Sequence, residues 1–292
     1  MTDKTNDKGQ PKSGLALSGG GARGLAHIGV LKLLEREEIP IDCLAGTSMG
    51  GVIAAGHAAG LDAAYLEQEA LHMGCWRNLL PLVDRSLPGL GLMKGERVRE
   101  YFVRHLGDKT FADLHLPLAL VTVDLLSGEE VILNSGRVVD AVRATVSLPG
   151  VLSPVRLDGR LLVDGGLLNN VPADVVRRMG ADVVVAVDVS ARLNGVSGLL
   201  AAEQEGASLL QIPLIIETLQ RVLGIMETWV WNHRLADARP EVVILPDVGE
   251  GITSFAGFHR ATEIIAAGEA AAEAALPRIR QALREQGGGA DF

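Results

Sequence analysis

A serine between glycines is the first feature of this sequence that could do chemistry. Gly46, Thr47, Ser48, Met49 and Gly50 form a G-x-S-x-G pattern between an apolar strand-like run and a helix-like run of small residues. A sharp strand-to-helix turn crowds the backbone, so the flanking positions must be glycine, and the serine is pushed out above the sheet at the positive end of the helix. This context favours a nucleophile elbow with Ser48 as the nucleophile over a purely structural glycine turn.

A second segment, rich in glycine, closes the preceding strand-like run. Consecutive glycines there leave backbone N–H groups pointing at open space, which makes an anion site. Beside Ser48, such groups would stabilise the oxyanion of a tetrahedral intermediate. The candidate oxyanion-hole residues are Gly19, Gly20, Gly21, Ala22, Arg23 and Gly24. Two interpretations of Arg23 stay open, because its side chain could stabilise charge at the site or simply pair with a carboxylate.

The same glycines also fit G-x-G-x-x-G, the dinucleotide-binding fingerprint. A Rossmann unit needs an acidic residue at the end of its second strand to hold the ribose. Here Asp42 stands at the start of the second strand, and that strand ends at Ser48 in a glycine turn. The dinucleotide interpretation is therefore the weaker one, and cofactor absorbance of the purified protein would reveal it.

A carboxylate follows a third strand-like run. Asp164 comes directly after the apolar residues 161–163 and is followed by Gly165 and Gly166. An acid at a strand terminus, freed by two glycines, is positioned to reach a neighbouring strand end, although Asp-Gly turns are also common without any function. Because two other strand ends are glycine-rich, we expect Asp164 to be catalytic and the two glycines to form its loop.

Together these segments resemble the patatin-like phospholipase family, specifically its compact bacterial members. The resemblance covers well over half of the chain, from about residue 15 to residue 189. It rests on GGGARG and LAHIGVL at 19–31, GTSMG at 46–50, VRAT leading to LPG at 142–150, DGG at 164–166 and NVP at 170–172.

The resemblance implies a Ser–Asp dyad in place of a triad. It makes Ser48 the nucleophile, Asp164 the base, and the backbone amides of Gly20, Gly21 and their neighbours the oxyanion hole. The implied substrates are acyl esters of phospholipids, lysophospholipids or neutral lipids, cleaved through an acyl-serine intermediate. One departure from the family pattern is Thr145, where the family more often has serine; this is not a catalytic position.

An aspartate is a weak base at neutral pH, since its ordinary pKa is about 3.9. Asp164 must therefore work in short-range contact with Ser48 in a desolvated pocket, where its pKa rises. A triad is the alternative, because His233 and His259 follow Asp164 in the order used by α/β-hydrolases. His233 lies in an amphipathic stretch and His259 at the entry to a surface-looking helix, so we expect neither to be essential.

Composition argues against several other classes of protein. The 292 residues, 48% hydrophobic and 22% charged, suit a globular chain with a sizeable core. A net charge of -9 without a basic block disfavours nucleic acid as a partner. Cys43 and Cys75 stand far apart without CxxC spacing, and the histidines are scattered, so we expect a reducing compartment, no disulfide and no metal site. We also expect no cofactor and a cytoplasmic location.

Apolar runs alternate with helical patterns along the chain. Near-continuous apolar strands between helices predict a mainly parallel sheet covered on both faces, hence a single three-layer α/β/α domain of the patatin-like kind. The expected domain covers residues 14–286, between a disordered tail, 1–13, and a flexible tail, 287–292. The expected strands are 15–18, 43–47, 118–126, 130–133, 161–163, 182–189 and 241–245. The expected helices are 22–36, 50–59, 62–72, 96–106, 138–145, 173–179 and a long one from about 257 that Pro277 kinks or divides.

Two further segments could belong to an acyl-binding mouth. Residues 206–235 are unusually apolar, and they form either core helices or a lid that meets lipid. The loop 87–93 could join the same mouth. The sequence as a whole predicts a serine lipid-acyl hydrolase that could contact a membrane peripherally. The alternative is a patatin-fold protein that binds lipid or a protein partner with little turnover.

Overall fold

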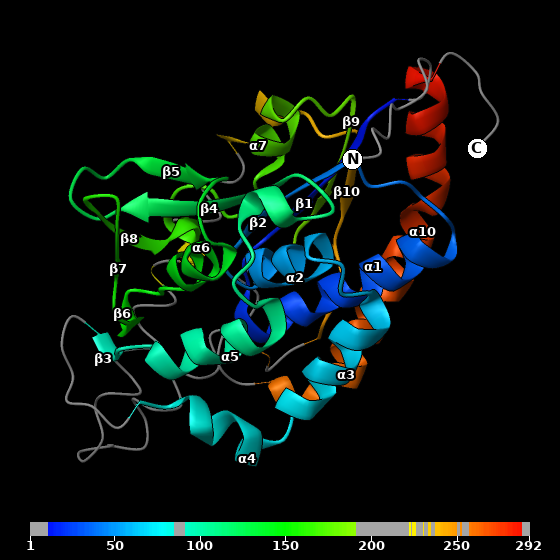
Figure 1. Ribbon diagram of the computed structural model, residues 1–292. Helices are drawn as coiled ribbons and strands as arrows, with labels where there is room; N and C mark the ends of the chain where they lie inside the picture. Colours follow the sequence, from blue (N-terminus) through cyan, green and yellow to red (C-terminus); the bar gives the residue numbers. More distant parts are fainter. Residues whose placement is uncertain are drawn as a thin grey trace.

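The computed structural model describes residues 11–84, 91–190, 222, 224–225, 230, 233–234, 237–249, 252 and 257–287. In these residues an eight-stranded sheet is flanked by helices (Figure 1). The strands are β1 Ser13–Leu17, β2 Cys43–Thr47, β3 Gly91–Met93, β4 Leu118–Asp124, β5 Glu130–Leu133, β6 Gly150–Leu152, β7 Val155–Leu157, β8 Arg160–Asp164, β9 Val183–Val187 and β10 Val242–Ile244.

The helices range from one turn to seven. The α-helices are α1 Ala26–Arg36, α2 Ser48–Ala58, α3 Ala63–Met73, α4 Trp76–Leu79, α5 Glu96–Leu106, α6 Val138–Thr145, α7 Ala173–Arg178 and α10 Ala261–Gln286. The short 3-10 helices are η1 Gly21–Leu25, η2 Leu80–Leu82, η3 Phe111–Asp113, η4 Gly165–Leu167 and η5 Phe258–Arg260. Asp62 caps α3, since its side chain accepts a hydrogen bond from the N–H of Tyr65 at 2.8 Å.

The sheet has a parallel part and an antiparallel part. Strands β10, β9, β1, β2 and β4 lie side by side and run parallel, whereas β8, β7 and β5 add antiparallel pairings. The expected strand 130–133 is present as β5, which pairs antiparallel with β4. The sequence did not predict β7, nor the small parallel pair of β3 and β6.

Strand β4 holds two other strands end to end along one of its edges. Residues 120–121 of β4 pair with both β2 and β5, and residues 122–123 pair with both β5 and β8. Because a strand has only two edges, β2 and β8 must share the edge opposite β5. They approach each other from opposite directions, so their carboxyl ends meet in the middle of β4.

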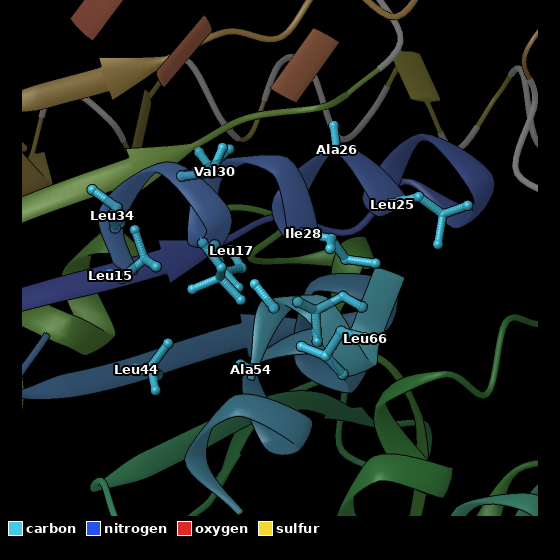
Figure 2. Packing of buried hydrophobic residues seen from close by; sticks show 14 of the residues in the cluster. Leu15, Leu17, Leu25, Ala26, Ile28, Val30, Leu34, Leu44, Ala54 and Leu66 are labelled. Atoms are coloured by element: carbon cyan, nitrogen blue, oxygen red, sulfur yellow. The ribbon is translucent and has the colours of Figure 1, made fainter. Parts of the chain in front are cut away.

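The two faces of the sheet pack against different helices. Leu15, Leu17 and Leu44 contact α1, α2 and α3 in the larger core, which also takes in α10 (Figure 2). Ala16 and Ala45, the alternating residues of β1 and β2, pack instead in a second cluster with α7. Successive side chains of buried parallel strands thus serve two cores, and the expected three-layer α/β/α fold is confirmed.

Details of the sequence expectations differ at the ends of the chain. Lys12 and Ser13, which we expected in the N-terminal tail, are held to the body of the fold: their N–H groups donate to Asp182 and Asp42. Helix α10 runs through Pro277 without being divided. Most of 206–235, and residues 87–90 of the expected acyl-binding loop, lie outside the described residues. No helix within the described ranges is both long and apolar enough to span a bilayer.

Candidate active site

Ser48 lies at the sharp turn between β2 and α2. Its backbone φ is +53°, a region that side-chain-bearing residues rarely occupy. The flanking glycines are needed for space, because a Cβ on Gly46 would lie 2.6 Å from the backbone of Gly51, and one on Gly50 would lie 2.3 Å from the carbonyl oxygen of Leu17. The crowding that the sequence predicts around the serine is therefore present.

The shared edge of β4 brings Asp164 to Ser48. Thr47, the last residue of β2, lies opposite Val121, and Asp164, the last residue of β8, lies opposite the next residue of β4, Thr122. The Ser48 hydroxyl donates a hydrogen bond of 2.6 Å to Oδ2 of Asp164. Two residues that are 116 positions apart in the chain are thus in direct contact because two strands end at the same point of a third.

The carboxyl group of Asp164 is buried, with only 5% of the residue exposed. Its Oδ1 accepts a hydrogen bond from the N–H of Gly166 at 2.9 Å, which is the role that the glycine loop plays here. Burial raises the pKa of Asp164 to about 6, while the hydrogen bonds from Ser48 and Gly166 oppose that rise. The carboxyl group is therefore a better proton acceptor near neutral pH than an ordinary aspartate.

The glycine-rich segment lines a cavity beside the serine. The cavity has a volume of about 150 Å³. Its walls are Gly19, Gly20, Gly21, Arg23, Ser48, Met49, Val146, Leu148, Asp164, Asn170, Ser190 and Phe258. The loop from β1, the turn after β2 and the end of β8 thus converge on one hollow, as the sequence motifs predict.

The six glycine-loop residues differ in what their N–H groups do. The N–H of Gly19 donates to the carbonyl of Asn170 at 3.1 Å, and the N–H of Arg23 donates to the carbonyl of Gly20 at 3.2 Å. Within the described part of the chain, the N–H groups of Gly20 and Gly21 have no protein acceptor. These two line the cavity, so they are the donors best placed to meet an anion there.

The remaining two loop residues serve packing. Ala22 is fully buried and does not line the cavity. Gly24 faces Met49, since a Cβ on Gly24 would lie 2.5 Å from Cγ of that methionine. Because Gly24 has no side chain, helix η1 can lie close to Met49 in the turn that carries Ser48. This close packing is the contribution of Gly24 to the site.

Comparison with known proteins identifies the family. The Patatin-like phospholipase family profile matches residues 15–177, more than half of the chain. The chain belongs to the patatin-like phospholipase family. The resemblance inferred from the sequence motifs is confirmed.

Relatives of known sequence extend this finding. An uncharacterized NTE family protein of Mycobacterium tuberculosis is 37% identical over 181 residues, 62% of this chain and 49% of that protein. The human patatin-like phospholipase domain-containing protein 6 is 39% identical over 185 residues, 61% of this chain and 13% of that protein. An uncharacterized NTE family protein of Mycobacterium bovis is 34% identical over 275 residues, 90% of this chain and 46% of that protein. The chain spans about half the length, or less, of these relatives.

Among solved structures, this chain matches that of VipD from Legionella pneumophila. It has a TM-score of 0.48 and 16% sequence identity, and the match covers 95% of this chain and 67% of VipD.

In this family member, the side chain of Arg23 forms hydrogen bonds with residues outside the glycine loop. Its Nε donates to the carbonyl of Val189 at 3.0 Å, and Nη1 donates to the carbonyl of Ile252 at 3.1 Å. The side chain also lines the cavity. Arg23 thus connects the glycine loop to Val189, which follows β9, and to Ile252. Its guanidinium also brings a positive charge to the cavity.

No histidine occurs among the cavity-lining residues of the described chain, and the hydrogen-bond partners of the Asp164 carboxylate there are Ser48 and Gly166. His27 instead bonds through Nε2 to the carbonyl of Ser18 at 2.8 Å, and burial lowers its pKa to about 4. The neutral His27 ring therefore donates a hydrogen bond to the carbonyl of Ser18, the residue between β1 and the glycine loop.

Two residues that shape the site, Asn170 and Thr145, were not predicted from the sequence to have a role there. Asn170 accepts from the N–H of Gly19 through its carbonyl and donates from Nδ2 to Ser190 Oγ at 2.8 Å, which joins three strand ends around the cavity. Thr145 Oγ1 accepts a hydrogen bond of 2.9 Å from the backbone N–H of Ser48. Both lie in segments that carry the family resemblance, VRAT and NVP, yet neither has a residue type or spacing that points to a role without the tertiary contacts.

Proposed function

We propose that this protein is a serine hydrolase that cleaves carboxylic ester bonds of lipid acyl chains with Ser48 as nucleophile and Asp164 as base. The observation that carries the proposal is the 2.6 Å hydrogen bond from the serine hydroxyl to a buried carboxylate whose pKa is raised to about 6. Membership of the patatin-like phospholipase family supports lipid esters as the substrate class.

The first half of the reaction forms an acyl-enzyme. Ser48 Oγ bonds to the carbonyl carbon of the ester, and its proton passes to Oδ2 of Asp164. The electron pair of the carbonyl moves onto its oxygen, and the N–H groups of Gly20 and Gly21 stabilise that charge. When the tetrahedral intermediate collapses, the bond to the alcohol breaks and the alcohol takes the proton from Asp164.

The second half releases the fatty acid. A water molecule gives a proton to Asp164 as its oxygen bonds to the acyl carbon. Collapse of this second tetrahedral intermediate breaks the bond to Ser48, whose oxygen regains the proton from Asp164. The side chains are thus returned to their starting state, and the sequence of steps consumes one ester and one water.

The proposal includes contact with a lipid surface. Leu71 of α3, Trp76 of α4, Leu80 of η2 and the following Val83 are exposed, and we call these four residues the α4 patch.

The α4 patch begins beside the cavity. Phe258 lines the cavity, and its carbonyl lies 2.9 Å from the position of a Cβ on Gly74, at the end of α3. The guanidinium of Arg77 lies 5.7 Å from the centre of the Trp76 ring, a pairing of aromatic and cationic groups that suits the interface between acyl chains and headgroups. An apolar surface next to the cavity would bring it to lipids that do not dissolve.

Covalent labelling with a fluorophosphonate probe tests the proposal. We expect the wild-type protein to be labelled, Ser48→Ala to be unlabelled, and Asp164→Asn to be labelled at least about 100-fold more slowly, since general-base catalysis contributes on that order. His259→Ala is the matched control and should be labelled at the wild-type rate.

Two outcomes would contradict the proposal. Folded wild-type protein that stays unlabelled, with and without detergent micelles, would favour the alternative of a lipid- or protein-binding protein with little turnover. Loss of labelling in a folded His259→Ala variant would replace the proposed dyad by a histidine-dependent mechanism.

A further inference from the structure

The last residue of α6, Thr145, lies directly behind the nucleophile. Its Oγ1 accepts a hydrogen bond from the backbone N–H of Ser48 at 2.9 Å and donates one to the carbonyl of Val121 at 2.6 Å. The threonine is fully buried, so its hydroxyl has no water to bond instead. One hydroxyl group therefore joins the nucleophile turn to the strand β4 that positions both β2 and β8.

The backbone of Ser48 needs such a restraint. A φ of +53° costs a side-chain-bearing residue free energy and persists only where the surroundings fix it. The preceding residue is held as well, since Thr47 Oγ1 donates to the carbonyl of Asn169 at 2.8 Å. The strained turn is thus attached on both sides, to Asn169 through Thr47 and to α6 and β4 through Thr145.

The same segment also contacts the base. Two residues beyond Thr145, the carbonyl of Ser147 accepts the backbone N–H of Asp164 at 3.0 Å. The Ser147 hydroxyl is in turn bonded by the buried guanidinium of Arg143 at 2.6 Å. The end of α6 therefore touches the main chain of both proposed catalytic residues.

The methyl group of Thr145 adds a packing contact. Its Cγ2 lies 3.0 Å from the position of a Cβ on Gly51, in the first turn of α2. Because β-branched side chains have few rotamers, this contact limits the directions in which the Thr145 hydroxyl can point. A serine in this place could form the same hydrogen bonds but would lack the methyl contact.

We propose that Thr145 is a positioning residue that holds the backbone of Ser48 so that its hydroxyl meets Asp164 at 2.6 Å. This inference rests on the proposed function. Thr145 does not touch the reacting atoms. Its bond occupies the N–H of Ser48, so this N–H is not available to bind an oxyanion.

The test compares Thr145→Val with Thr145→Ser. Valine keeps the shape and removes the hydroxyl, whereas serine keeps the hydroxyl and removes the methyl group. We expect kcat on a soluble ester to fall about 10- to 100-fold in Thr145→Val with KM unchanged, since displacement of a reacting group by about 1 Å costs roughly that much. Thr145→Ser should retain kcat within about threefold of the wild type.

A second measurement needs no turnover. The hydrogen bond from Ser48 lowers the pKa of Asp164, so its loss must raise that pKa. In a ¹³C NMR titration of the aspartate carboxyl groups, Ser48→Ala gives the reference for a broken bond. We expect the Asp164 pKa of Thr145→Val to move up toward that reference and that of Thr145→Ser to stay at the wild-type value.

A control separates positioning from general loss of stability. Ser13, at the end of β1 opposite the glycine loop, is also buried, and its hydroxyl donates to the carbonyl of Pro40. Ser13→Ala should lower the melting temperature while leaving kcat and the pKa of Asp164 unchanged. If Thr145→Val does not fold, Thr145→Cys, whose thiol is a weak hydrogen-bonding group, takes its place.

The possible results are distinct. A Thr145→Val variant with wild-type kcat and a wild-type Asp164 pKa, whatever its melting temperature, would overturn the positioning role. A wild-type protein that neither reacts with fluorophosphonate nor cleaves esters would contradict the proposed function, and the NMR comparison would still decide whether Thr145 holds the contact between Ser48 and Asp164.

Discussion

At the scale of single residues, Asp164 combines a requirement of the proposed chemistry with a cost to folding. Its carboxyl group is buried, and burial raises its pKa to about 6, above the ordinary value for an aspartate. A base must be ionised to accept a proton, whereas burial disfavours the ionised form. Rising pH should therefore favour catalysis and oppose stability over the same interval.

The activity should follow ionisation of Asp164. We expect kcat/KM on a soluble ester to rise tenfold per pH unit below about pH 6 and to level off above it, because the carboxylate form is the active one. Initial rates between pH 4.5 and 8, with the fold checked by circular dichroism at each pH, measure this profile. A profile that is flat from pH 5 to 8 would be incompatible with a base of this pKa.

The stability should change in the opposite direction. Between pH 4 and 6 the folded protein binds more protons at Asp164 than the unfolded chain does, so this residue lowers the free energy of unfolding as pH rises through that window. Asp164→Asn removes the effect, and its amide can still accept from Gly166 and donate to Ser48. We expect the variant to be more stable than the wild type by roughly 3 kcal/mol at pH 8.

The sign of that prediction is checked at low pH. At pH 4 Asp164 is protonated in the folded protein and about half protonated in the unfolded chain, so most of the advantage of Asp164→Asn should disappear. Urea unfolding of both proteins at pH 4 and pH 8 makes the comparison. An Asp164→Asn variant that is less stable than the wild type at pH 8 would show that the carboxylate stabilises the fold.

At the scale of secondary-structure elements, α4 and its neighbours extend away from the sheet (Figure 1). Trp76 is 63% exposed and Leu80 is 56% exposed, which is unusual for large apolar side chains so close to one another. Neither side chain contributes to the buried core, so replacing them with serine should cost little stability. Their effect on activity should depend on whether the substrate is presented in a lipid surface.

The double variant Trp76→Ser, Leu80→Ser tests the α4 patch. We expect at least a fivefold loss of activity on phospholipid vesicles and unchanged kcat/KM on a soluble short-chain ester, because burial of the two side chains in lipid would contribute several kcal/mol to binding. Leu126→Ser is the matched control, since Leu126 is 69% exposed at the turn after β4, outside the patch. Equal losses on both substrates would point to a defect of the cavity and not of lipid contact.

At the scale of the whole molecule, the close crossing of α1 and α10 fixes one side of the fold (Figure 1). A Cβ on Gly268 would lie 1.9 Å from the carbonyl oxygen of Ala26, and one on Gly29 would lie 2.0 Å from the carbonyl oxygen of Ile265. The two glycines let the helix backbones touch. Helix α1 continues directly from η1 and the glycine loop, so this contact also anchors the cavity wall.

Gly268→Ala should force the two helices apart. We expect a loss of about 3 kcal/mol in the free energy of unfolding, the upper end of what overpacked core positions usually lose, despite the better helix propensity of alanine. Gly128→Ala is the control, since that glycine has φ +75° but no atom near its Cβ position, and should lose only about 1 kcal/mol. Urea denaturation measures both, and a Gly268→Ala variant as stable as the control would mean that α10 can shift at little cost.

The sequence by itself determined the family, the three-layer fold and the pair Ser48 and Asp164. The family and the pairing of Ser48 with Asp164 came from the resemblance that the motifs carry. The fold came from local rules, because apolar runs predict buried strands and glycines beside a serine or an aspartate predict strand ends with exposed functional groups. The structure places Gly19, Gly20 and Gly21 of the predicted glycine loop at the cavity, whereas the sequence did not distinguish Gly20 and Gly21 from Gly19, whose N–H donates to the carbonyl of Asn170.

Only the tertiary structure decided how these residues meet. The contact between Ser48 and Asp164 depends on β2 and β8 sharing one edge of β4, and antiparallel pairing of β8 is not encoded in any local pattern. The positions of Thr145 and Asn170 behind the site follow from the same packing. A buried polar side chain takes its role from the partner that the fold brings to it, and long-range partners leave no periodic signal in the chain.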